Sequence, residues 1–290
     1  MKRTVDLVVP FIDNTDKVWQ EIFINYCVAH NFKEKIADLH TDRYEDIGLI
    51  NYQLKLINKY MPFVDRIFLI LMNQEQAPKD LPSNVKIVYH GAFIPQKYLP
   101  TFNSTTIEMF LWNIKDLGEY FIYANDDMLP FKPLKVSDFF TSKGKCKIEW
   151  WEEDIRKLQN TFRYQCFNSY KHIAYRLQKR TEQYIYLRPA HSMTPMIKSH
   201  CKQAYDLISD VINKHIWAFR TNYQYNQYIY PCFEKFVYGT EDSKIDFLYT
   251  QLKDNVIDLD HDIVCLNIVP KKLEKTLIQE LEERTKWITQ

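Results

Sequence analysis

Acidic residues follow two segments that have the composition of β-strands. Asp13 comes after the segment at 5–9, and Asp126 and Asp127 come shortly after the segment at 120–123. Carboxylates at the carboxyl end of a strand can bind a hard cation such as Mg²⁺ or Mn²⁺, which in turn neutralises a diphosphate leaving group. The alternative is an ordinary Asx turn, because Asp and Asn readily occupy such positions. The spacing alone leaves both interpretations open.

One histidine and two arginines are further candidates for chemistry. His191 lies in a loop between Pro189 and Pro195, where it could act as a general base or contact a phosphate. Arg43 and Arg220 could each bind phosphate through two N–H groups. A packing histidine and salt-bridged surface arginines are the commoner roles, so these residue types do not decide the function by themselves.

Other residues have weaker claims. His90 and His261 lie near the ends of expected strands. The segment 221–230 is rich in tyrosine and amide side chains, which could stack against a sugar or a nucleobase or could fill a core. Core filling is the commoner use of such residues.

The elements that must position these residues belong to a folded globular chain. It has 290 residues, of which 46% are hydrophobic and 26% charged. The 38 Lys and Arg nearly balance the 37 Asp and Glu, so the net charge is +1 and no global field attracts nucleic acid. The five glycines are isolated from one another, which excludes both a GxGxxG turn and a P-loop.

The N-terminus runs straight into a strand-like segment and lacks the pattern of a secretory signal. The longest apolar run, at 67–72, is too short to span a bilayer. We therefore expect a cytoplasmic protein without a transmembrane segment, and peripheral association with the inner face of the membrane stays open. The six cysteines are scattered without a CxxC pair, so we expect reduced and mostly buried thiols.

Strand-like and helix-like segments alternate through the first half of the chain. Apolar residues at 47, 50, 54 and 57 predict a helix over 47–60 with one buried face. This alternation is typical of an α/β fold, in which a mostly parallel sheet has helices on its faces and ligands bind beyond the carboxyl ends of the strands. We expect strands at 5–9, 66–72, 85–89 and 120–123 and a further helix at 105–114.

The composition changes near residue 149. Residues 150–180 lack glycine and proline and predict a helix. In the tail from 271, Leu273, Leu277, Leu281 and Ile288 lie on one stripe, which predicts an amphipathic helix. Packing on the domain is its commoner role, and binding to a membrane surface or a partner is the alternative. We expect an α/β core at 1–148. A mostly helical segment at 149–290 would complete the active site within one compact unit.

Three motifs resemble the conserved blocks of the Stealth proteins. These are hexose-1-phosphate transferases of bacterial capsule assembly, related to animal N-acetylglucosamine-1-phosphotransferase. The first block is VDLVVPFIDNTDKVW at 5–19. The second begins with RYEDIG at 43–48, continues through LPTFNS at 99–104 and closes on FIYANDD at 121–127. Looser matches are His191 with Pro195, FRT at 219–221 and VCLN at 264–267.

The resemblance implies that the core at 1–148 is nucleotide-sugar-transferase-like and binds the sugar nucleotide and a cation, Mg²⁺ or Mn²⁺. It also implies transfer of hexose-1-phosphate from a UDP-sugar to a hydroxyl of a glycan or lipid-linked saccharide acceptor, with release of UMP, in the synthesis of capsular or cell-surface polysaccharide. Carried over by position, it assigns catalysis to Asp13, Asp127, His191 and Arg220, and the metal to Asp126 and Asp127. It assigns substrate binding to Arg43, Asn103, Glu108, Asn125 and Asn267.

The sequence departs from the family pattern at four positions. Asn14 stands where the family usually has Gly, Leu49 where it often has an acid, Lys55 where Arg is expected, and Ile268 where it commonly has Asp. Two other functions use similar parts. A metal-dependent glycosyltransferase would attack the anomeric carbon and release UDP, and a non-catalytic protein would only bind a sugar nucleotide or glycan. The motif at 99–104 and the first block favour the phosphotransferase.

Overall fold

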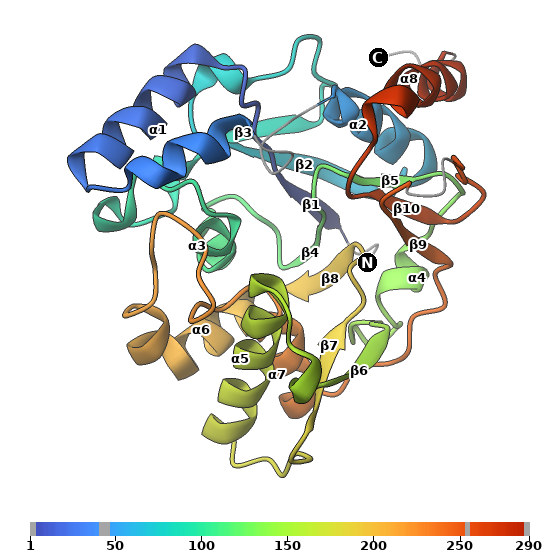
Figure 1. Cartoon of the computed structure of the whole chain (residues 1–290). Coiled ribbons are helices and arrows are strands. Elements are labelled where there is room, and N and C mark those ends of the chain that lie inside the picture. Colours follow the sequence, from blue (N-terminus) through green and yellow to red (C-terminus); the bar gives the residue numbers. More distant parts are fainter. Residues whose placement is uncertain (1–3, 41–46, 253–255, 287–290) are drawn as a thin grey trace.

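A five-stranded sheet forms the centre of the chain. The structure is a computed structural model that describes residues 4–40, 47–252 and 256–286, and these make up the elements in Figure 1. The strand order within them is β3-β2-β1-β4-β8, in which the first four strands are parallel and β8 is antiparallel to β4. The bounds are β1 Val5–Pro10, β2 Val64–Leu71, β3 Val85–Tyr89, β4 Tyr120–Tyr123 and β8 Thr194–Ile197.

The sheet lies between two apolar cores, so its central strands are apolar on both faces. Val8 and Phe121 point to a core shared with α5, α6 and α7, whereas Leu7 and Ile122 point to a core shared with α2. Figure 1 shows these helices on opposite sides of the sheet. The helices are α1 Lys17–Ala29, α2 Leu49–Tyr60, α3 Ser104–Glu108, α4 Val136–Phe139, α5 Thr161–Arg176, α6 Lys198–Ile212, α7 Ile229–Val237 and α8 Lys271–Thr285.

Two smaller sheets extend the core. One has the order β5-β10-β9, with β10 antiparallel to β5 and parallel to β9, and the other pairs β6 with β7. The bounds are β5 Met128–Pro130, β6 Trp150–Asp154, β7 Ile185–Pro189, β9 Phe247–Thr250 and β10 Ile263–Leu266. Because β8 pairs with β4, the central sheet crosses the boundary expected at 148/149, and the second half contributes strands as well as helices.

A buried acidic residue, Asp6, links neighbouring elements in the middle of the sheet through hydrogen bonds. Asp6 in β1 accepts hydrogen bonds from Arg66 in β2, at 2.8 and 3.1 Å, and from the backbone N–H of Gly118, at 2.7 Å. A Cβ atom at Gly118 would lie 2.9 Å from the Asp6 carboxylate. Glycine at 118 therefore permits the close approach that satisfies the Asp6 side chain.

The strands expected from the sequence are confirmed, but two helix predictions need correction. In place of the helix expected at 105–114, the structure has the short helix α3, which ends at Glu108. The chain turns at 109, and every residue from Thr105 to Phe110 is buried in the core. The helix expected at 150–180 begins only at Thr161, because Trp150–Asp154 pairs with β7 as a strand. Aromatic residues favour such a half-buried strand, and a composition without glycine or proline does not exclude it.

Three further expectations are confirmed. All six cysteines lie in the described part of the chain, and each is a buried free thiol. Within α8, Leu277 and Leu281 are fully buried against the core next to α2, whereas Ile288 of the same stripe lies outside the described residues. Most of 221–230 fills the interior, although Tyr223 is exposed. Among the described helices, none combines the length and apolar character needed to cross a membrane.

Candidate active site

A cavity of about 890 Å³ lies beyond the carboxyl ends of the parallel strands. Ile12 follows β1, Met72 follows β2, His90 follows β3 and Asn125 follows β4 on its wall. This is the place where open α/β sheets bind ligands. Most of the candidate residues from the sequence meet here, drawn from both halves of the chain. Those on the wall are Asn103, Glu108, Asn125, Asp126, Asp127, His191, Arg220 and Asn267.

Asp13 and Arg43 are not among them. Asp13 Oδ1 accepts hydrogen bonds from the backbone N–H of Thr15, at 2.8 Å, and from the Thr15 hydroxyl, at 2.6 Å. The structure therefore places Asp13 in the Asx turn that leads into α1, and not on the wall of the cavity. Arg43 lies outside the described residues.

The acidic turn, residues 125–127, is held from two sides. From α2, the buried Gln53 donates its amide N–H groups to the backbone oxygens of Asn125, at 2.6 Å, and Met128, at 2.7 Å. From β10, the backbone N–H of Leu266 donates to the oxygen of Asp127 at 2.9 Å. The role of Gln53 could not be predicted from the sequence, because a glutamine inside an amphipathic helix gives no signal of its partner.

Asp127 has an oxygen that is available for a ligand. Its Oδ1 atom is buried and has no hydrogen-bond partner among the described residues. Burial raises the pKa of Asp127, and hydrogen bonds from the side chains of Cys265 and Asn267 oppose the shift. The Asn267 carbonyl oxygen accepts from Tyr249 and Gln251, at 2.7 and 3.3 Å, which leaves its N–H groups for Asp127. Asn267 therefore orients the carboxylate.

A divalent cation fits Asp126 and Asp127. In the described part of the chain, no three His, Cys, Asp or Glu side chains are grouped so that they could hold a metal by themselves. Mg²⁺ usually uses one or two carboxylates together with water and substrate phosphates. Two adjacent carboxylates, one with an unpaired buried oxygen, match that donor set. Ile268, where the family commonly has Asp, also lines the cavity.

His191 is a neutral imidazole on the wall of the cavity. Burial, followed by the charges of Arg188 and Arg220, lowers its pKa to about 4. Asn125 donates to Nε2 at 3.4 Å, and Nδ1 lies 3.3 Å from the Tyr228 hydroxyl, which in turn donates to Ala190 O at 3.5 Å. This pattern assigns the proton to Nδ1 and the lone pair to Nε2.

Two aromatic rings fix the plane of the imidazole. Phe162 and Tyr249 meet His191 edge-on, with ring centroids at 5.3 and 5.6 Å. The ring is thus held in one orientation in the cavity, as a base that receives a proton from a bound substrate requires.

Glu108 and Asn103 line the cavity and also hold its framework together. Glu108 accepts from the Tyr123 hydroxyl at 3.2 Å and from Gln227 N–H at 2.9 Å, while Arg220 lowers a pKa that burial raises. Asn103 caps α3 through Thr105 and donates to Trp217 O and Gln224 Oε1 at 3.0 and 3.1 Å, which uses its whole amide group. Both residues connect α3 to 217–227 and so position Arg220, whose guanidinium contacts Ser104.

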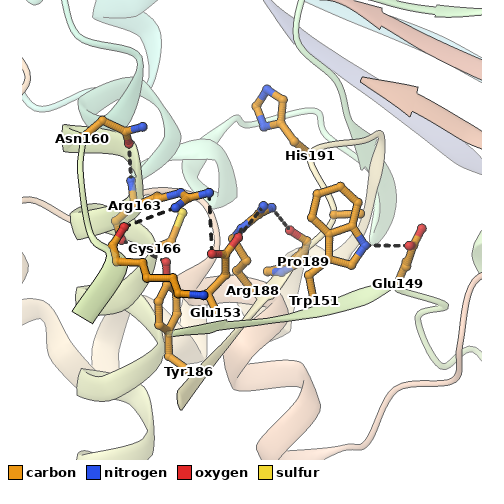
Figure 2. Close-up of polar contacts among 12 residues, drawn as sticks. Glu149, Trp151, Glu153, Asn160, Arg163, Cys166, Tyr186, Arg188, Pro189 and His191 are labelled. Atoms are coloured by element: carbon orange, nitrogen blue, oxygen red, sulfur yellow. Dashed lines mark hydrogen bonds and ion pairs between the residues drawn. The ribbon is translucent and has the colours of Figure 1, made fainter. Parts of the chain in front are cut away.

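Two more arginines on the wall were not identified from the sequence. Arg163 in α5 and Arg188 in β7 converge on Glu153 in β6, and His191 lies on the side of Arg188 (Figure 2). The expected helix at 150–180 gave no reason to place these arginines together. In the structure, the pairing of β6 with β7 brings Glu153 to Arg188. The position of Arg188, three residues before His191, was the one available signal.

The cavity also has unsatisfied polar groups near β3. Both ring nitrogens of His90 and the hydroxyl of Thr101 are buried on its wall without a hydrogen-bond partner in the residues that the structure describes. Burial lowers the pKa of His90 to about 4, so this ring is also neutral at physiological pH. Such groups carry the energetic penalty of lost hydration.

Relatives of known name share much of this sequence. A capsular polysaccharide phosphotransferase of Neisseria meningitidis serogroup B is 31% identical over 218 residues, which cover 73% of this chain and 58% of that protein. The capsular polysaccharide phosphotransferase cps1A of Actinobacillus pleuropneumoniae is 36% identical over 163 residues, 55% of this chain and 44% of that protein. The matches therefore span about half the length of these relatives.

A likeness among solved structures is far weaker. The galactosyltransferase LgtC, crystallised with donor and acceptor sugar analogs, matches over 98% of this chain and 96% of its own, with 9% identity and a TM-score of 0.37. Residues 43–148, in contrast, match the family model described as Stealth protein CR2, conserved region 2. This segment includes α2, α3 and the acidic turn. The chain therefore carries conserved region 2 of the Stealth proteins, as its motifs predicted.

Proposed function

We propose that the chain is a capsular polysaccharide phosphotransferase that moves hexose-1-phosphate from a UDP-sugar to a hydroxyl of a glycan or lipid-linked acceptor and releases UMP. The observation that carries the proposal is the meeting of Asp126, Asp127, His191 and Arg220 on one cavity wall, with the acidic turn inside the matched conserved region. The names of the relatives agree with this reaction class.

The chain's own residues suit phosphoryl transfer, which asks for positioning and for neutralisation of charge. Arg220, oriented by Ser104 and Glu108, binds the transferred phosphoryl group and offsets its charge. His191 Nε2 takes the proton of the acceptor hydroxyl as that oxygen bonds to phosphorus. Tyr228 and Asn125 hold the imidazole in the required tautomer.

Asp126 and Asp127 would hold the cation, Mg²⁺ or Mn²⁺. The bound cation supplies Lewis-acid neutralisation of the diphosphate. Asn267, which follows β10, orients the Asp127 carboxylate, and Gln53 in α2 holds the backbone of the acidic turn at Asn125 and Met128. The bond between the anomeric carbon and its oxygen stays intact throughout.

The nucleotide released identifies the reaction. Purified chain with Mg²⁺ is incubated with a panel of UDP-sugars and glycan acceptors, and UMP and UDP are quantified. We expect UMP that depends on the acceptor. Asp126→Asn and Asp127→Asn should each lower its release by at least about a hundredfold, because each removes charge from the cation site. Asp206→Asn, at an exposed ion pair on α6, is the matched control and should keep the full rate.

Two outcomes would contradict the proposal. Release of UDP in place of UMP would mean attack at the anomeric carbon, and the chain would be a glycosyltransferase that uses the same acidic turn. Full UMP release by both variants would mean that Asp126 and Asp127 do not hold the cation.

A further inference from the structure

An arginine wall, which we define as Trp151, Arg163 and Arg188, forms one side of the cavity (Figure 2). The Arg188 guanidinium stacks against the Trp151 ring, 4.6 Å from its centroid. It also contacts Glu153 Oε1, at 2.9 Å through Nε and 2.8 Å through Nη2. The stack and the ion pair fix Arg188 in place before any ligand binds.

The arginines of the wall pair with Glu153, and a second carboxylate, Glu149, accepts from Trp151 Nε1 at 2.6 Å. Arg163 Nη2 lies 3.7 Å from the second oxygen of Glu153, so two guanidinium groups share one carboxylate. Both arginines also keep donors. The contacts of Arg188 within the described residues, including one to Pro189 O at 3.2 Å, use three of its five N–H groups. The Arg163 side chain is one-third exposed and donates to Lys157 O at 3.3 Å.

The wall adjoins His191, the base assigned to the acceptor hydroxyl. Arg188 precedes the His191 loop in β7, and Phe162, next to Arg163 in α5, contacts the imidazole directly. The groups assigned to the donor, Asp126 and Asp127 after β4 and Arg220 beside α3, come from other elements. A ligand that offers its hydroxyl to His191 therefore extends along the arginine wall.

The proposed reaction determines what such a ligand carries. The acceptor oxygen forms a bond to the phosphorus of the sugar-1-phosphate, the bond between that phosphorus and the UMP oxygen breaks, UMP keeps the electron pair, and the hydroxyl proton passes to His191. The product is a phosphodiester with one negative charge. If the product of one cycle is the acceptor of the next, each acceptor has a phosphodiester one sugar behind its hydroxyl.

We propose, on the basis of the proposed function, that the arginine wall binds the phosphodiester of the growing polymer. Guanidinium groups suit this role because they give two parallel N–H groups to a phosphate. Trp151 adds a flat apolar face of the kind that packs on a sugar ring. The chain thereby prefers acceptors that it has already extended to acceptors without phosphate.

Binding experiments can test the wall without knowledge of the natural sugar. The full chain, saturated with UMP and Mg²⁺, is titrated with the methyl diester of α-D-glucose 1-phosphate and, separately, with neutral methyl α-D-glucoside. The ¹⁵N NMR signals of the arginine Nε–H groups report the site. We expect the diester, and not the glucoside, to shift the signals of Arg163 and Arg188.

Variants separate the wall from the donor site. Arg163→Gln should weaken diester binding about tenfold, the loss of one charge-assisted contact, while UMP affinity stays the same. Arg163→Lys should restore part of it. Arg156→Gln is the control, since Arg156 is exposed near β6 and contacts Asp154 outside the cavity. Thermal melts verify the folding of each variant, and the wild-type NMR shifts provide a test that needs no variant.

Each result has a definite meaning. An equal loss of UMP and diester affinity in Arg163→Gln would mean that the wall belongs to the donor site. If the diester leaves the NMR signals of Arg163 and Arg188 unchanged, the proposed subsite does not exist. If UMP fails to bind the wild-type chain but the diester binds through Arg163, the donor assignment fails and the wall is retained.

Discussion

At the residue scale, a neutral imidazole and charged side chains lie together on the wall of the cavity. His191 is kept neutral by burial and by two guanidinium groups, while the buried carboxylate of Asp127 has an oxygen without a hydrogen-bond partner among the described residues. An anionic ligand would neutralise part of the arginine charge and so raise the pKa of His191. The base would thus become stronger when substrate is bound.

His90 predicts how stability depends on pH. Its pKa is about 4 in the folded chain and ordinarily about 6.5. Between these values the unfolded chain binds a proton that the folded chain does not, so stability is lost as pH falls below 6.5. We expect His90→Leu to be at least as stable as wild type at pH 7 and to gain about 2 kcal/mol on it by pH 5. Urea unfolding at both pH values measures this.

His261→Gln is the control with the opposite sign. Asp246 and Asp258 raise the pKa of His261, so its contribution to stability is present at low pH and is lost as pH rises through the folded pKa. His261→Gln should therefore destabilise the chain more at pH 5 than at pH 8. A His90→Leu variant with the same acid sensitivity as wild type would contradict the burial of a neutral imidazole.

At the element scale, α2 positions the acidic turn through one side chain. Gln53→Leu removes the two hydrogen bonds from Gln53 to the backbone oxygens of Asn125 and Met128. We expect a loss of about 1–3 kcal/mol in the free energy of unfolding, together with weaker cation binding. Denaturant unfolding and Mn²⁺ titration measure the two effects. Asn51→Leu, at an exposed position of the same helix, should change neither, and unaltered Mn²⁺ affinity in Gln53→Leu would show that the turn holds its shape unaided.

The strands and the acidic residues that follow them were predictable, because an apolar run and the residues next to it are local signals in the sequence. The strands at 66–72 and 85–89, and the group at 125–127, were found from a few residues each. The contacts that assemble the site are long-range. Gln53 to Asn125 and Arg188 to Glu153 depend on packing that no local pattern records. The place of Asp13 in an Asx turn away from the cavity wall could not be predicted either, because a turn and a ligand site share one composition.

At the scale of the whole molecule, α8 ties stability to the cavity. Leu281 is fully buried among Leu56, Val264 and Leu266, and Leu266 supports the acidic turn through its N–H group. Leu281→Ala should cost about 2–5 kcal/mol of unfolding free energy. Thermal and urea unfolding measure it, with Gln279→Ala on the exposed face as the control. Wild-type stability in Leu281→Ala would mean that α8 contributes little to this core.

The topology of the central sheet has a consequence for biosynthesis. β1 leaves the ribosome first, yet it lies between β2 and β4, and the edge of β4 is closed only when β8 has been made. Such non-local pairing is slow to form and leaves strand edges open to other chains in the meantime. The region 43–148, which matches the family model, contains neither β1 nor β8. This conserved region therefore cannot form the central sheet by itself. The central sheet can therefore be completed only after residue 197 has left the ribosome.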